Sequence, residues 1–381
     1  MPDFLAYCGA EQPWVRELLE SLVRLESPSD DKPAVDRCGD ELAQRLGSLG
    51  ATVRRFPQTA IGAHVRAEFS GATTTQVLLL GHFDTVWRVG TIASMPLQER
   101  DGRLYGPGVF DMKAGIAIAM LAMRALAATR RRAPRVVMLW TADEEVGSGT
   151  SRALVEEEAG RSEAVLVLEP ALPGGAAKTS RKGVGDFTLT VHGVSAHAGL
   201  DPGKGASAIH ELARQVLALE ALQDLSRGIS VNVGTIAGGT RPNVVADRAS
   251  AEVDVRVPTM ADASRLDAVI RALTPIHPLT RLDVAGGINR PPLERTPGVI
   301  RLYERARRAA RRVGRDLLEG AAGGASDGNF TGALGVPTLD GLGPPGDGAH
   351  AHHEHVVIAD LGWRAAFLAE LLASFADAPK R

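Results

Sequence analysis

Ionisable side chains follow three short apolar runs of the sequence, each just after the run ends. The runs and the residues that follow them are Val77 to Leu80 with His82, Val136 to Trp140 with Glu144 and Glu145, and Val165 to Leu168 with Glu169. Because ligands of open α/β sheets bind beyond the carboxyl ends of the strands, we expect these side chains to line one edge of a sheet. Imidazoles and carboxylates bind divalent metals, so this pattern favours metal-assisted hydrolysis.

His82 and Asp84 are two residues apart. A histidine after a strand is more often structural than ligating, but this spacing lets one imidazole nitrogen bind a metal while Asp84 accepts a hydrogen bond from the other. Glu144 and Glu145 are adjacent, so their side chains point in different directions. One of the two can bind metal while the other takes a proton from metal-bound water.

Asp111 lies in a glycine-rich turn, Gly106 to Lys113, that opens an apolar segment with helical periodicity. An aspartate at this point can simply cap the helix. It can also bridge two cations about 3.5 to 4 Å apart, because a carboxylate has two oxygens. The second interpretation gains weight because other candidate ligands are expected at the same edge.

The elements that must position these groups read as a largely parallel sheet, because the apolar runs are nearly continuous and are separated by helix-like segments such as Lys113 to Thr129. Two amphipathic helices are expected between Trp14 and Leu49. After about Lys182 the pattern becomes β-α-β-β-α-β, which is typical of a ferredoxin-like unit. Long helices then resume at Val299 to Val313 and Leu361 to Phe375. We therefore expect an α/β domain over residues 1–182 and 291–381, with a mostly parallel central sheet and helices on both faces, and an inserted α+β domain over residues 183–290.

The bulk composition narrows the class of protein. The 381 residues favour two domains. The formal net charge of −2 provides no field for holding nucleic acid or a membrane surface. Cys8 and Cys38 are too few for a disulfide scaffold, and we see neither a secretory signal nor a membrane span, so we expect a cytoplasmic protein. The basic run Arg305 to Arg315 is interpreted as a solvated helix face.

Four segments, in this order, resemble the M20 family of metallopeptidases, and especially its glutamate carboxypeptidase branch. They are HFDTV at His82 to Val86, GPGVFDMK at Gly106 to Lys113, TADEEVGS at Thr141 to Ser148, and Glu169 with Pro170. The resemblance covers nearly the whole chain. It implies a zinc-hydrolase catalytic domain, with the inserted domain acting as a lid that also builds a homodimer.

The resemblance also implies two zinc ions per chain, although mixed histidine and carboxylate sites accept Co²⁺ or Mn²⁺ as well. His82 and Glu169 would bind one zinc, Glu145 and a late histidine the other, and Asp111 would bridge them. Glu144 would be the general base and Asp84 would orient His82. The family usually places the last ligand four residues before a glutamate, which here is Glu354. This favours His350, with His352 and His353 as alternatives.

On the substrate side, the resemblance assigns His197 to the oxyanion of the partner's active site. Asn243, with Arg256 or Arg290, would hold the substrate carboxylate, since the arginine fork binds carboxylates through two hydrogen bonds. Arg256 at the end of its strand can equally face solvent.

Two further positions match residues of the glutamate-cleaving branch. Lys178 and Arg290 match positions that read the acidic side chain and the α-carboxylate. Ser326 lies in a glycine-rich loop where the branch usually has threonine. The expected reaction is hydrolysis of the amide bond before a C-terminal amino acid, glutamate or another acidic residue, in a small peptide or an N-acyl amino acid. Alternatives are an N-acyl amino acid deacylase or desuccinylase, and a metal-binding relative that has lost catalysis.

Overall fold

The computed structural model describes residues 3–376, and the chain divides into two compact units. Unit 1 comprises Met1–Ser180, Arg295–Ala322 and Ser326–Arg381. Unit 2 comprises Arg181–Glu294 with Gly323–Ala325. The expected domain limits, after residues 182 and 290, lie close to these and stay predictions.

Unit 1 is built on a six-stranded sheet with the order β1-β2-β6-β3-β7-β14. Its strands are β1 (Thr52–Phe56), β2 (His64–Phe69), β3 (Gln76–His82), β6 (Arg135–Thr141), β7 (Ala164–Val167) and β14 (Thr338–Leu339). β6, β3, β7 and β14 run parallel, whereas β2 pairs antiparallel with both β6 and β1. The expected α/β fold class is confirmed, and the sheet is mixed because β2 runs antiparallel to both of its neighbours.

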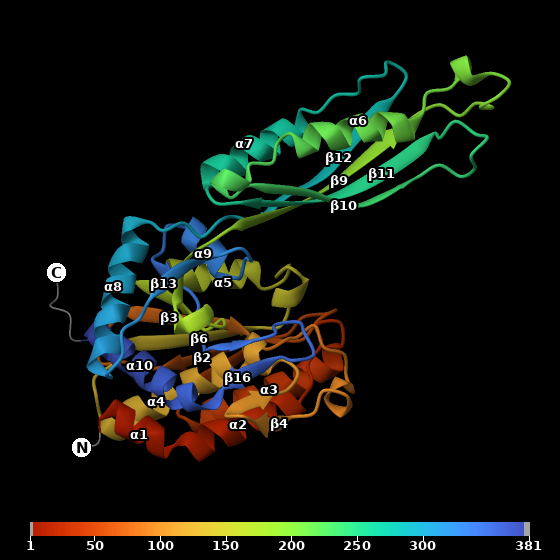
Figure 1. Cartoon of the computed structure of the whole chain (residues 1–381). Coiled ribbons are helices and arrows are strands. Elements are labelled where there is room, and N and C mark those ends of the chain that lie inside the picture. The colour runs from red at the N-terminus through yellow and green to blue at the C-terminus, as the bar shows by residue number, and fades with distance from the viewer. Residues whose placement is uncertain (1–2, 377–381) are drawn as a thin grey trace. The chain divides into compact units, whose positions relative to one another are not determined.

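Successive side chains of a strand point to opposite faces of the sheet, and both faces are apolar here, so the apolar runs are continuous. Val77 and Leu79 of β3 face one core cluster, and Leu78 and Leu80 face another. The first cluster is closed by α4 (Ala114–Thr129) and α10 (Ile358–Ala376), the second by α5 (Arg152–Gly160) and α9 (Gly328–Ala333). Figure 1 shows these two pairs of helices on opposite faces of the sheet. Both faces are therefore buried, as a parallel sheet requires.

The remaining elements of unit 1 surround this framework. The helices are α1 (Phe4–Ala10), α2 (Gln12–Arg24), α3 (Lys32–Ser48) and α8 (Pro297–Arg312). A small sheet joins β15 (Gly346–Asp347), β16 (His355–Val357), β5 (Arg103–Tyr105) and β4 (Gln98–Arg100), while β8 (Ala177–Arg181) pairs with β13 (Glu319–Ala322). The small sheet joins the segment before Asp111 to the segment after the late histidines. Within residues 3–376 the structure contains no helix of sufficient length and apolarity to span a bilayer.

Unit 2 is a four-stranded antiparallel sheet with two helices, in the order β-α-β-β-α-β expected from the sequence. Its elements are β9 (Gly183–His192), α6 (Ala208–Glu220), β10 (Ser230–Gly238), β11 (Arg248–Val257), α7 (Met260–Arg271) and β12 (Arg281–Arg290). The strand order is β10-β11-β9-β12. Phe187, Leu189 and Val191 of β9 pack into the core that α6 and α7 close.

Candidate metal centre

His82, the last residue of β3, is 1% exposed and lies at the carboxyl edge of the parallel strands. Its Nδ1 lies 3.0 Å from the backbone carbonyl of Asp84 and 3.4 Å from the carboxylate of that residue. A carbonyl oxygen only accepts, so Nδ1 carries the hydrogen and Nε2 is left as a metal ligand. The backbone carbonyl of Asp84 thus fixes the tautomer of His82, a role that the sequence predicts for the Asp84 carboxylate.

The carboxylate of Asp84 is buried and holds the loop that carries the two glutamates. It accepts hydrogen bonds from the backbone N–H groups of Glu144 (3.3 Å) and Glu145 (3.2 Å), and from the hydroxyl of Ser29 (2.7 Å). One side chain therefore ties the end of β3 to the loop after β6.

Asp111 lies between two sets of candidate ligands. Its Oδ1 is 3.3 Å from His82 Nε2, which is itself 3.4 Å from Glu169 Oε1. Its Oδ2 is 3.4 Å from His350 Nε2, which is 3.2 Å from the Glu145 carboxylate. Asp111 thus presents one oxygen to each set.

These spacings provide a test of whether the residues fit zinc. With bonds of about 2.0 Å, two ligands of one tetrahedral zinc stand about 3.3 Å apart. The distances within each set, from 3.2 to 3.4 Å, agree with that value. Ligand atoms of His82, Asp111 and Glu145 also lie within 4.8 Å of one another. The donors present therefore suit two cations bridged by Asp111.

Of the late histidines, His350 is the one that reaches these carboxylates. His352 lies beside the ring of Trp87, with 5.7 Å between ring centroids, and His353 Nε2 lies 3.9 Å from Asp347. His350 has a left-handed φ of 60°, a backbone conformation that is uncommon for a residue other than glycine. The geometry supports the choice of His350, whose role as a ligand stays a prediction.

Glu354, which served in the sequence only to locate His350, has a function of its own in the structure. Its buried carboxylate accepts hydrogen bonds from the backbone N–H groups of Gly108 (2.9 Å), Phe110 (2.8 Å) and Asp111 (3.0 Å), and from Trp87 Nε1 (2.7 Å). Gly108 has φ 71°, a conformation that favours glycine. Glu354 therefore fixes the turn that presents Asp111.

We expect Glu354→Gln to lower zinc affinity about 10- to 100-fold while the chain stays folded, because the new amide group places donors against the N–H groups of the turn. Competition with a metallochromic chelator measures this affinity, and circular dichroism checks the fold. Glu20→Gln is the control, since the Glu20 carboxylate lies on α2 and pairs with Arg16. Unchanged zinc affinity in Glu354→Gln would contradict the assignment.

The electrostatics of the cluster make metal binding dependent on pH. Hydrogen bonds to Asp111 and Glu145 raise the pKa of His350 to about 10. Burial opposes charge on His82, but hydrogen bonds to Asp111, Asp84 and Glu169 outweigh it and raise the pKa of that imidazole. The metal-free site therefore holds protons at neutral pH.

Zinc must displace these protons, so we expect zinc affinity to rise with pH up to about 10 and zinc binding at pH 7 to release protons. Calorimetry in two buffers of different ionisation enthalpy counts the released protons. His350→Gln should release fewer, and His353→Gln should match the unmodified protein. An equal proton count for His350→Gln and the unmodified protein would show that His350 is not involved.

The candidate substrate residues of unit 2 fall into two groups at opposite ends of its sheet. His197 pairs with Val244, and the Ala198 N–H donates to the Asn243 carbonyl, so His197 and Asn243 lie on adjoining loops. Arg256 and Arg290 both pair in register with Val184, at the other end of β9. The eight residue steps from Val184 to His192 span about 26 Å. Asn243 therefore does not meet either arginine within one chain.

Hydrogen bonds fix the state of two of these side chains. Nδ1 of the exposed His197 accepts from the backbone N–H groups of Gly199 (3.1 Å) and Leu200 (3.0 Å). Its proton therefore resides on Nε2, which can donate to an oxyanion. Arg256 makes a two-point ion pair with Asp254 of its own strand, at 2.7 and 2.9 Å.

The two candidates of unit 1 are buried. Lys178 is 7% exposed, and its backbone N–H donates to the carbonyl of Asp340, which follows β14. Ser326 is fully buried, and its hydroxyl donates to the Asp340 carboxylate at 2.6 Å. The hydroxyl of Ser326 thus anchors the end of the glycine-rich loop to Asp340. Direct contact of this hydroxyl with substrate stays a prediction.

Comparison with known proteins provides independent information on this centre. A model described as Peptidase family M20/M25/M40 matches residues 78–374. Carboxypeptidase G2 of a Pseudomonas species is 28% identical over 95% of this chain and 89% of its own. Succinyl-diaminopimelate desuccinylase of Paracidovorax citrulli is 32% identical over 85% of this chain and 89% of its own. In structure, an aminopeptidase from Bacillus cereus superposes with a TM-score of 0.83 at 22% identity, covering 96% of this chain and 99% of that one.

Proposed function

Because this chain belongs to the peptidase family M20/M25/M40 and is a metallohydrolase of amide bonds, we propose that it removes a C-terminal amino acid, glutamate or another acidic residue, from small peptides or N-acyl amino acids. The observation that carries the proposal is the double ligand set joined by the two oxygens of Asp111. The similarity to carboxypeptidase G2, which extends over 95% of the chain, supports the C-terminal specificity.

The residues of the centre divide the work of amide hydrolysis. Bound zinc would polarise the amide carbonyl and acidify the attacking water. His82, Glu169, Glu145, His350 and the bridging Asp111 are the proposed ligands. Glu144, on the loop held by Asp84, takes a proton from the attacking water and returns it to the leaving nitrogen.

We assign recognition of the C-terminal amino acid that is released to cationic side chains. Arg290 and Lys178 are proposed to read the α-carboxylate and the acidic side chain, and Arg256 is an alternative for the α-carboxylate. Arg256 forms an ion pair with Asp254, so its guanidinium would have to exchange that partner for a substrate carboxylate. The second candidate function is desuccinylation of an N-succinyl amino acid, which the 32% identity to a desuccinylase favours.

A panel of substrates distinguishes the two functions. On zinc-loaded protein, we expect kcat/KM for N-benzoyl-glutamate to exceed that for N-benzoyl-alanine by about 100-fold, since a charged pair is lost with alanine. N-succinyl-diaminopimelate should be the poorer substrate. Preference for the succinyl compound would replace the carboxypeptidase proposal with the desuccinylase, and hydrolysis of none of the three would refute both.

We further propose a cytoplasmic homodimer formed through unit 2, in which His197 and Asn243 serve the active site of the partner. The length of β9 supports this, because the arginines lie at one end of this strand, the loops of His197 and Asn243 follow its other end, and a small substrate cannot touch both ends of one sheet. β10 is an edge strand with Ile236 61% exposed, and exposed edges of this kind pair with a second chain.

Mixing two inactive variants tests this arrangement. His197→Ala and Glu144→Gln chains, each nearly inactive alone, should regain about a quarter of full activity once subunits exchange, because each mixed dimer contains one intact site. Two Glu144→Gln preparations mixed together are the control. No recovery after proven exchange would place His197 outside the partner's site.

A further inference from the structure

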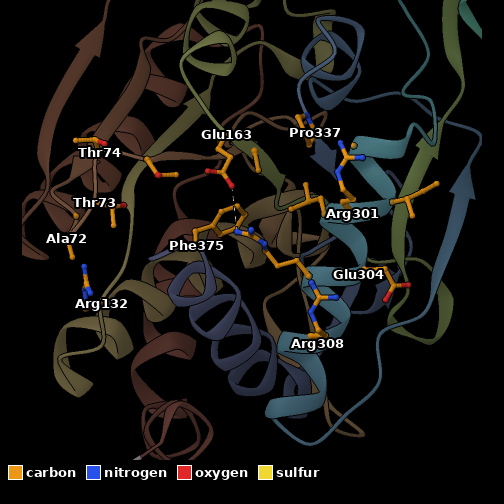
Figure 2. A pocket seen from close by; sticks show the side chains of 17 residues that line it. Ala72, Thr73, Thr74, Arg132, Glu163, Arg301, Glu304, Arg308, Pro337 and Phe375 are labelled. Carbon is orange, nitrogen blue, oxygen red and sulfur yellow. Dashed lines mark ion pairs between the residues drawn. The ribbon is translucent and has the colours of Figure 1, made fainter. Parts of the chain in front are cut away.

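Unit 1 contains a cavity of about 1310 Å³ at the amino ends of its parallel strands, the edge opposite to the metal centre. Its lining includes Thr75 before β3, Glu163 before β7 and Pro337 before β14, together with one face of α8. Figure 2 shows Glu163 and Phe375 at its centre, Arg301 and Arg308 on one side, and Thr73, Thr74 and Arg132 on the other. The proposed reaction uses none of these groups.

The charged groups that line the cavity are four arginines and two glutamates, which leaves two uncompensated positive charges. They are Arg132, Arg301, Arg305, Arg308, Glu163 and Glu304. Since the whole chain has a net charge of −2, this local excess runs against the overall balance. Positive charge gathered in a hollow attracts anions.

Three arginines of the helix α8 line the cavity, and two of them belong to the basic run Arg305 to Arg315. Arg301, Arg305 and Arg308 are spaced i, i+4 and i+7, so they share one face. The rest of the run is neutralised elsewhere: Arg307 and Arg311 bind Asp316, Arg312 binds Glu370 and Arg315 binds Asp360. The run is therefore not one uniform solvated face, because Arg305 and Arg308 line the cavity.

Two donors of the cavity lack a hydrogen-bond acceptor among the described residues. Arg305 Nη1 and Thr73 Oγ1 are buried and have no hydrogen-bond partner among residues 3–376. The guanidinium of Arg305 stacks on Phe375 at 4.1 Å and lies 3.7 Å from Glu163, beyond hydrogen-bond length. A buried donor without an acceptor costs free energy, which a bound anion or water would recover.

We propose that this cavity binds a small organic dianion, a phosphate or a dicarboxylate, with its charged groups on the arginines of α8. Arginine forks bind phosphate and carboxylate oxygens through paired hydrogen bonds. Phe375, Ile300, Leu302 and Pro337 also line the cavity, so the ligand has an apolar part beside its charges. The volume accommodates a drug-sized molecule.

Titration of the zinc-loaded protein with 1-naphthyl phosphate and with naphthalene-1,4-dicarboxylate tests the site. The stronger binder shows whether the anionic groups of the ligand are phosphate or carboxylate. We expect both to bind more tightly than inorganic phosphate, which has no apolar part. Arg301→Gln with Arg308→Gln should weaken binding of the stronger probe about tenfold or more. Arg307→Gln with Arg311→Gln is the control, since it removes the same charge from the same helix outside the cavity, and should leave affinity unchanged.

Two results would overturn the proposal. One is that neither probe binds at a concentration of about 1 mM. The other is binding that persists in the Arg301 and Arg308 double variant, which would place the probe elsewhere, the metal centre included. Thermal melting and amide hydrolysis should be unchanged in both double variants, because the substituted residues lie at the edge of the sheet away from the ligands.

Discussion

Glu144→Gln is expected to lower kcat by about 10²- to 10⁴-fold while two zinc ions stay bound per chain, because the amide retains the size of the side chain and removes the group that accepts a proton. KM should change little, since Glu144 is not a proposed substrate contact. Steady-state kinetics on N-acyl glutamates and metal analysis of the same preparation measure the two quantities. The backbone N–H of Glu144 still reaches Asp84 in the variant, so the loop keeps its position.

The control for this substitution is Glu157→Gln, which removes an exposed carboxylate of α5 that pairs with Arg161. It should retain full activity. If Glu144→Gln loses zinc together with activity, Glu144 is a ligand and not the base. If it retains both, Glu144 is neither the base nor a ligand, and another group moves the proton.

Asp111→Asn is expected to lower zinc content well below two ions per chain and to reduce kcat/KM about a thousandfold or more. The amide offers one acceptor oxygen where the carboxylate offers two, and the missing contact is the one that joins His82 and His350. Loss of metal removes several kcal/mol of transition-state stabilisation. Plasma emission spectrometry and kinetics at saturating zinc separate weak binding from impaired catalysis.

Asp30→Asn provides the matched control, because Asp30 is an exposed turn residue. It should bind two zinc ions. An Asp111→Asn protein that still held two ions at equal affinity would show that Asp111 does not bridge, and would support the interpretation of this residue as a helix cap.

The edge of the sheet that carries the candidate ligands could be predicted from the sequence, because continuous apolar runs such as Val77 to Leu80 have few alternatives to a strand buried on both faces. β1 and β2 gave no such signal. In β2 the polar residues His64, Arg66 and Glu68 alternate with apolar ones. The guanidinium of Arg66 forms an ion pair with Glu158, which lies far along the chain. Contacts of that kind are invisible in a local pattern.

The same limit applies to the site. The role of Glu354 depends on backbone N–H groups at Gly108, Phe110 and Asp111, which residue types do not reveal. The separation of Asn243 from Arg256 depends on strand register, which only the folded sheet fixes. The cavity depends on which arginines of α8 find a carboxylate elsewhere. The kind of reaction could therefore be predicted from residue types. The hydrogen bonds that hold the candidate ligands, and the distances between side chains, could not.

The hydrogen bonds of Glu354 to the Asp111 turn have a consequence for how the protein is made. The ribosome completes the Asp111 turn more than two hundred residues before Glu354 and His350 emerge. Until then the turn lacks the acceptor for its N–H groups, and the second set of proposed ligands lacks its imidazole. With the proposed ligands, we therefore expect a growing chain to take up its pair of metal ions only after His350 and Glu354 have emerged from the ribosome.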